Sequence, residues 1–69
     1  MNEAPMPQAE IHVYRTRSVR RSQRWAWRMV AANGRTVACS GEGYSDRLEA
    51  ADRAWMVARG DYDVTMTLH

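Results

Sequence analysis

The chain has 69 residues and a net charge of +2 at neutral pH, and all ten of its basic residues are arginine. A chain of this length buries only about 60% of the surface that it exposes when unfolded, so we expect one marginal domain that a partner chain completes. The single cysteine excludes an intrachain disulfide, and Cys39, His12 and His69 lack zinc-like spacing, so we predict no metal and no cofactor. Without a membrane-length apolar run or a signal-peptide pattern, we expect a cytoplasmic protein with no membrane partner.

The first seventeen residues predict an arm followed by a strand. Residues 1–9 contain two prolines and no periodic pattern, which indicates a flexible N-terminal arm before a single domain over residues 10–69. In residues 10–17, Ile11 and Val13 alternate with polar or amphipathic residues, which is typical of a half-buried strand. His12 is then expected to be an exposed side chain or one at the rim of the sheet.

Positive charge is concentrated between residues 15 and 35, which hold seven arginines and no acid: Arg15, Arg17, Arg20, Arg21, Arg24, Arg28 and Arg35. Interleaved with Trp25 and Trp27, this composition suits contacts with phosphates and stacking on bases. A solvated basic surface, or one that meets the acidic half of a second copy, is the alternative. The exclusive use of arginine fits GC-rich coding as well as it fits selection for the guanidinium group.

Residues 24–40 predict two strands joined by a two-residue turn at Asn33-Gly34. That dipeptide supplies the two positive-φ positions of a type I′ turn. In the strand before the turn, Trp25, Trp27 and Met29 point to the same face, and this heavier face should pack on the helix.

The predicted turn also sets the pairing of the two strands. It places Arg28 opposite Cys39, Met29 opposite Ala38, and Val30 opposite Val37. The face with Val30, Val37 and Cys39 is apolar enough to form a self-association or ligand surface. Cys39 is interpreted as a packed residue and not as a nucleophile, because no histidine lies near it in sequence.

A helix is predicted over residues 46–59, after a glycine-containing turn. Tyr44 occupies the position of a hydrophobic staple, Ser45 is the expected N-cap, and Gly60 follows the last turn. The predicted core-facing side consists of apolar residues at helical spacing: Leu48, Ala51, Ala54, Trp55 and Ala58, flanked by Ala50 and Val57.

Residues 61–68 alternate regularly and predict a last strand, with Tyr62, Val64, Met66 and Leu68 on one face. Because a helix precedes it, this strand should run parallel to the first and third strands. It can pair with the first strand of its own chain or with a neighbouring chain. The predicted fold is therefore α+β, a small sheet of β-β-β-α-β order with one helix packed on one face, assembled as a homodimer.

Several of these segments together resemble the YegP-like family of small domains. They are Trp27-x-Met29, Ala32-Asn33-Gly34, Ala38-x-Ser40 and Gly43-Tyr44 before an alanine-rich helix, and the resemblance covers about residues 23–59. It implies a compact α+β unit, often repeated in tandem or paired as a dimer, with no established activity. We therefore expect a non-enzymatic binding or assembly module whose protein partner is a second copy of the chain.

The three antiparallel strands, the arginine- and tryptophan-rich sheet and the alanine-rich helix also resemble DNA-binding domains of the AP2 and integrase arm-binding type. On that resemblance, Arg15, Arg17, Arg24, Arg28 and Arg35 would contact phosphates or guanine edges. A sheet-based DNA-binding protein is thus the alternative function. We predict no enzymatic activity, because no nucleophile and base can be placed together.

Overall fold

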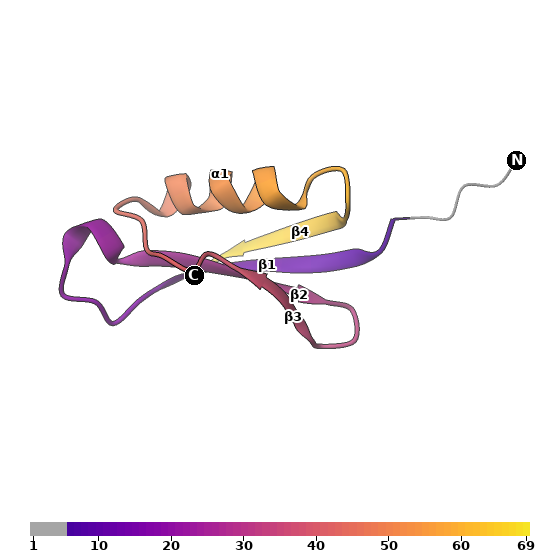
Figure 1. The fold of residues 1–69 in the computed structure, drawn as a ribbon, viewed down its shortest axis with the longest axis horizontal. Helices are drawn as coiled ribbons and strands as arrows, with labels where there is room; N and C mark the ends of the chain where they lie inside the picture. Colours follow the sequence, from indigo (N-terminus) through magenta and orange to yellow (C-terminus); the bar gives the residue numbers. More distant parts are fainter. Residues whose placement is uncertain (1–5) are drawn as a thin grey trace, which may run out of the picture.

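A computed structural model describes residues 6–69 of the chain. Within this range the chain forms β1 (Gln8–Arg15), the short 3-10 helix η1 (Arg21–Gln23), β2 (Trp25–Ala31), β3 (Thr36–Cys39), α1 (Arg47–Ala58) and β4 (Asp63–Leu68). The helix covers one face of a single sheet (Figure 1). The predicted α+β class and the order β-β-β-α-β are confirmed. The first strand begins two residues earlier than predicted, and residues 1–5 of the predicted arm lie outside the described residues.

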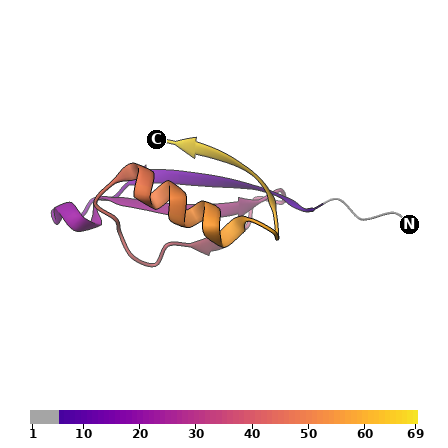
Figure 2. The ribbon, with the colours of Figure 1, turned by 90° about the horizontal axis from the view of Figure 1, so that it is seen from above.

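The strands lie in the order β3-β2-β1-β4. The strand β2 is antiparallel to β1 and β3, whereas β4 pairs in parallel with β1. A parallel strand needs a long crossover connection, and α1 provides it by carrying the chain from one edge of the sheet to the other (Figure 2). The predicted direction of the last strand is confirmed, and its partner is β1 of the same chain.

The turn between β2 and β3 is not of type I′. Gly34 donates its N–H to the Ala31 carbonyl at 2.9 Å, and Ala31 donates to the Arg35 carbonyl at 2.8 Å. Gly34 has a φ of 86°. In the described part of the chain, only glycines have a positive φ. Asn33 instead accepts the Arg35 N–H on its side-chain oxygen at 3.0 Å. The loop is therefore a three-residue hairpin loop. It matches the twist of the strands with one glycine of positive φ, whereas a type I′ turn needs two residues of positive φ.

The longer loop changes the pairing next to the turn. The predicted pairs of Arg28 with Cys39 and of Met29 with Ala38 are confirmed, but Val30 pairs with Thr36 and not with Val37. The prediction for Val30 is wrong because the loop shifts the register by one residue. Val37 is then the extra residue of a β-bulge, which restores the predicted register further along the strand.

The core lies between the sheet and α1. The strands contribute Ile11 and Val13, which are fully buried, together with Trp27 and Met29. Six of the ten buried hydrophobic residues are alanines, and four of those belong to α1: Ala50, Ala51, Ala54 and Ala58. Small side chains let the helix approach the sheet closely, but they supply little apolar area. The core of the described residues is therefore small.

The ends of α1 differ from the prediction by one residue. Asp46, and not Ser45, is the N-cap, because its carboxylate accepts the N–H of Leu48 at 3.0 Å. The helix ends at Ala58, and the following Arg59 N–H donates to the Trp55 carbonyl at 2.9 Å. Gly60 then takes a left-handed conformation, with φ 87°, that leads into β4.

The prediction that Leu48 and Trp55 face the core is wrong. Leu48 is 63% exposed, Trp55 is 47% exposed, and Val57 at the opposite flank is 51% exposed. The apolar spacing of a helix is the same whether a position holds alanine or tryptophan, so the spacing does not show which of two neighbouring positions around the helix axis is buried. The alanine stripe fills the space between helix and sheet, so the larger side chains beside it remain outside.

Candidate functional site

Residues 16–24, here called the basic loop, connect β1 to β2. Hydrogen bonds within the loop hold its conformation. Thr16 donates its N–H to the Arg24 carbonyl and its hydroxyl to the Gln23 carbonyl, both at 2.6 Å. Ser18 donates its N–H to Thr16 Oγ1 at 3.2 Å, and Arg20 donates its N–H to Ser18 Oγ at 3.1 Å. Short polar side chains thus close the turns of the loop and fix its backbone.

The basic loop is docked against the connection between β3 and α1. A Cβ atom added at Gly43 would lie 2.5 Å from the Cα and the carbonyl oxygen of Gln23. Next to this contact, Tyr44 and Trp25 exchange backbone hydrogen bonds of 2.6 and 2.9 Å. Arg47, at the start of α1, lies over the Trp25 ring with its guanidinium carbon 5.8 Å from the ring centre. The loop is therefore part of the folded domain.

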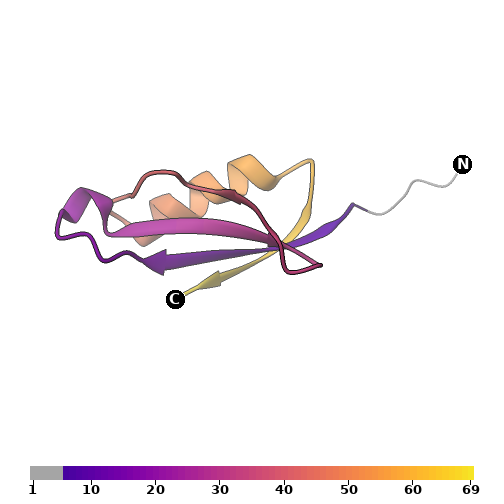
Figure 3. The same cartoon turned by 60° about the horizontal axis from the view of Figure 1, so that its bottom comes forward.

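The structure separates the seven arginines of the predicted nucleic-acid surface. Arg17, Arg20 and Arg21 are exposed in the basic loop, with Arg15 and the half-buried Arg24 at its two ends. Arg28 lies in the middle of β2, and Arg35 lies in the turn at the opposite end of the sheet (Figure 3). Five of the seven therefore gather at one end of the molecule, and two do not.

None of these charges is neutralised by an ion pair with the described residues. Within residues 6–69 no carboxylate oxygen lies within 4.0 Å of an arginine guanidinium nitrogen, and the one ion-pair contact joins His12 to Glu10. Val19, between Arg17 and Arg20, is 93% exposed. The basic loop thus presents positive charge and one apolar side chain to solvent.

The predicted self-association residues lie on or next to β3. Val30 is half-buried, Val37 is 44% exposed in the bulge, and Cys39 is an exposed free thiol. They belong to the face of the sheet that α1 does not cover, here called the open face, on which Arg28 also lies with its guanidinium carbon 5.2 Å from the centre of the Tyr14 ring. The charged Arg28 side chain over the Tyr14 ring makes the open face partly polar.

A second apolar surface escaped the sequence reasoning. The outer helix surface consists of Leu48, Trp55, Met56 and Val57, each between 47% and 63% exposed. Only Met56 is expected there, because it lies opposite the predicted core side. The signal that could have revealed the others is the number of alanines in α1, since four of them suffice to fill the contact with the sheet.

The described part of the chain contains neither a metal-binding cluster nor a membrane-spanning helix. No three histidine, cysteine, aspartate or glutamate side chains of residues 6–69 come together in a way that could hold a metal ion. No helix in this range has the length and apolar character needed to cross a membrane.

Comparison with known protein families finds a match for the central part of the chain. Residues 21–54, which run from the basic loop through the hairpin into α1, match the family described as a domain of unknown function, DUF1508. This is the YegP-like family, so the first resemblance drawn from the sequence is confirmed, whereas nothing supports the AP2 or integrase type. No curated protein and no solved structure matches the chain.

Proposed function

We propose that this chain, whose residues 21–54 match the DUF1508 family, is a non-enzymatic binding and assembly module that pairs with a second copy of itself. The observation that carries the proposal is the exposure of Trp55 and Leu48 on the outer helix surface. We place the module in the cytoplasm, where a single unpaired thiol such as Cys39 stays reduced.

Exposed side chains of this size on so small a domain favour an interface. Leu48 and Trp55 lie about two turns apart on the same side of α1, and exposed apolar side chains that gather on a soluble protein commonly mark a contact with another chain. Tryptophan is enriched among the few residues that supply most of the binding energy at such contacts. The alanine-rich core adds to the argument, because burial of Trp55 and Leu48 by a partner would supply apolar area that the core of one chain lacks.

The distribution of charge favours a second copy as the partner. Residues 15–35 carry seven arginines and no acid, whereas the residues after them carry three arginines and six acids. Two copies arranged with the basic part of one near the acidic part of the other attract each other, and this attraction selects the partner and its orientation. The arginines of the basic loop, which form no ion pair with residues 6–69, are available for such contacts.

Two substitutions test which surface is used. Trp55→Gln is expected to abolish self-association in sedimentation velocity runs, since it removes the largest exposed side chain of the outer helix surface. The matched change on the open face, Val37→Gln, should leave self-association intact. If Val37→Gln dissociates the chain and Trp55→Gln does not, the open face is the interface. If neither does, self-association through these two surfaces is refuted. Circular dichroism verifies that each variant is folded.

A second candidate function, nucleic-acid binding, is favoured by the basic loop. Its backbone is held by internal hydrogen bonds, so little ordering is needed on binding, and its arginines have no carboxylate partner among the described residues. Arginines in such a setting attract phosphates and release condensed counterions. The contact would be independent of sequence, because it is made to the backbone of the nucleic acid.

Arg20→Glu combined with Arg21→Glu is expected to abolish duplex binding in fluorescence anisotropy. The matched control is Arg53→Glu with Arg59→Glu, an equal change in net charge on exposed residues of α1 and its C-cap. The unchanged chain should bind less tightly as salt rises, with a steep log-log slope. Equal losses for both double variants would show that only net charge matters, and no binding at low salt would exclude this function.

A further inference from the structure

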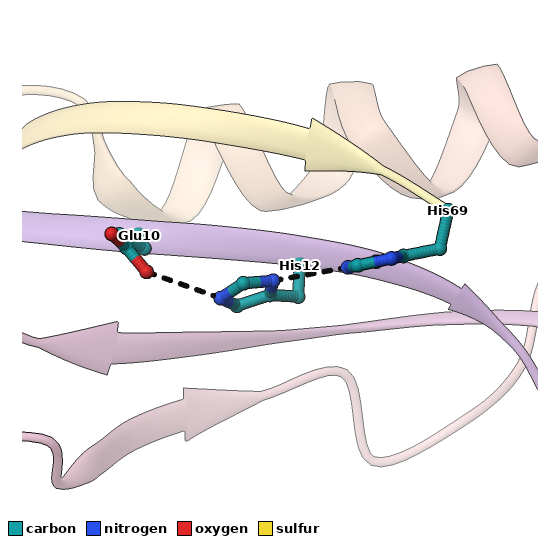
Figure 4. A network of polar contacts seen from close by, with 3 residues as sticks. All are labelled: Glu10, His12 and His69. Carbon is teal, nitrogen blue, oxygen red and sulfur yellow. Dashed lines mark hydrogen bonds and ion pairs between the residues drawn. The ribbon is translucent and has the colours of Figure 1, made fainter.

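The two histidines of the chain meet on the open face, although 57 residues separate them in sequence (Figure 4). His12 Nδ1 lies 3.1 Å from His69 Nε2, and the rings are inclined by 22° to each other. The other nitrogen of His12, Nε2, lies 3.3 Å from a carboxylate oxygen of Glu10. The His69 N–H also donates to the Val13 carbonyl at 2.9 Å, so this contact lies where the end of β4 joins β1.

The contact between the rings limits how many protons they can hold. A hydrogen bond between two imidazole nitrogens needs one N–H donor and one lone pair. When both rings are neutral, His12 donates from Nε2 to Glu10, accepts at Nδ1, and His69 is the donor. When His12 gains a proton, it donates to a neutral His69. When both rings are protonated, two N–H groups and two positive charges face each other, and the contact must open.

The charged groups that face the two rings come from β1 and β2. On β1, Glu10 contributes a negative charge beside His12, and Tyr14 is neutral. On β2, Arg28 pairs directly with His12 and adds a positive charge. On β4, the residue paired with His12 is the uncharged Thr67. The helix lies on the other face of the sheet, so none of its charges faces the rings.

We propose that His12 and His69 form a latch that fastens the end of β4 to β1 at neutral pH and releases it in weak acid. The strand β4 is an edge strand, and its release uncovers the backbone of β1 around Val13, an edge at which another strand can pair. Histidine is the side chain whose ordinary titration falls in this range, and the chain contains only these two. The latch depends on the pairing of β1 with β4 within one chain and not on the proposed self-association.

Heteronuclear 15N relaxation of the backbone amides at neutral and weakly acidic pH tests the latch. Leu68 and His69 are expected to become mobile in acid, while the amide of the buried Ile11 stays rigid. Loss of one hydrogen bond of ordinary strength should raise the opening equilibrium roughly two- to tenfold. In His12→Thr, the end of β4 should be mobile at both pH values.

The control for that experiment is Thr65→Val, a change on the same face of β4 at a position that pairs with neither histidine. It should keep the pH response of the unchanged chain. The latch is refuted if Leu68 and His69 show equal mobility at both pH values in the unchanged chain. It is also refuted if His12→Thr responds to acid in the same way as the unchanged chain.

Discussion

Replacing Ile11 with alanine is expected to lower the free energy of unfolding by about 3 kcal/mol. Ile11 is fully buried in the middle of β1, paired with Met29 on one side and Met66 on the other. The change removes apolar contacts and leaves a cavity that a small core cannot refill. Since a domain of this length is stable by roughly 3–10 kcal/mol, the loss is a large part of the total.

Urea unfolding followed by circular dichroism measures this effect at one fixed protein concentration, because self-association would add to the apparent stability. Val19→Ala is the control, since Val19 is 93% exposed and its truncation should change stability by less than about 0.5 kcal/mol. Equal unfolding midpoints for the two variants would contradict the described core.

The second large effect is expected for Gly43→Ala, which should cost about 2 kcal/mol and loosen the basic loop. The added methyl group would meet the Cα and the carbonyl oxygen of Gln23, and backbone atoms cannot rotate away as a side chain can. The same carbonyl accepts the hydroxyl hydrogen of Thr16, so displacing it breaks a bond that closes the loop. The φ of Gly43 is not positive, so the cost is steric.

Hydrogen exchange of the Thr16 and Trp25 amides, combined with urea unfolding, reports both consequences. Ser45→Ala is a suitable control, because Ser45 is exposed and is not the residue that caps α1. The contact is disproved if Gly43→Ala has the stability of Ser45→Ala and unchanged exchange at the base of the loop.

Much of the fold follows from local patterns in the sequence. The alternation around Ile11 and Val13 and the alternation after Gly60 predict β1 and β4, and the helix between the last two strands predicts their parallel direction. These patterns are strong because one face of each strand is buried and the other is solvated. The position of the hairpin was also predictable from Asn33-Gly34.

The details of the hairpin and of the helix depended on interactions that the local pattern does not contain. Asn33 supports the turn with its side chain and not with a positive φ, and this choice produced the bulge at Val37. Trp55 and Leu48 fit a helical apolar face, yet alanines at nearby angles fill the contact with the sheet. Which residues of an apolar helix become buried is decided by the distance between helix and sheet.

The candidate sites were also only partly predictable from the sequence. The run of arginines was visible in the sequence, but only the fold places five of them at one end and Arg35 at the other. The meeting of His12 with His69 was not predictable from their spacing, because it results from the register of a parallel pair that a crossover connects. The sequence predicted only an exposed or rim side chain for His12.

Sedimentation equilibrium of the unchanged chain over a wide range of concentrations tests most directly the claim that this chain, part of which matches the DUF1508 family, is an assembly module. The monomer mass is 7.9 kDa. Self-association predicts a mass that rises with concentration to twice that value and that falls again when Trp55 is replaced by glutamine. A mass that stays at the monomer value at every concentration would contradict the proposed function.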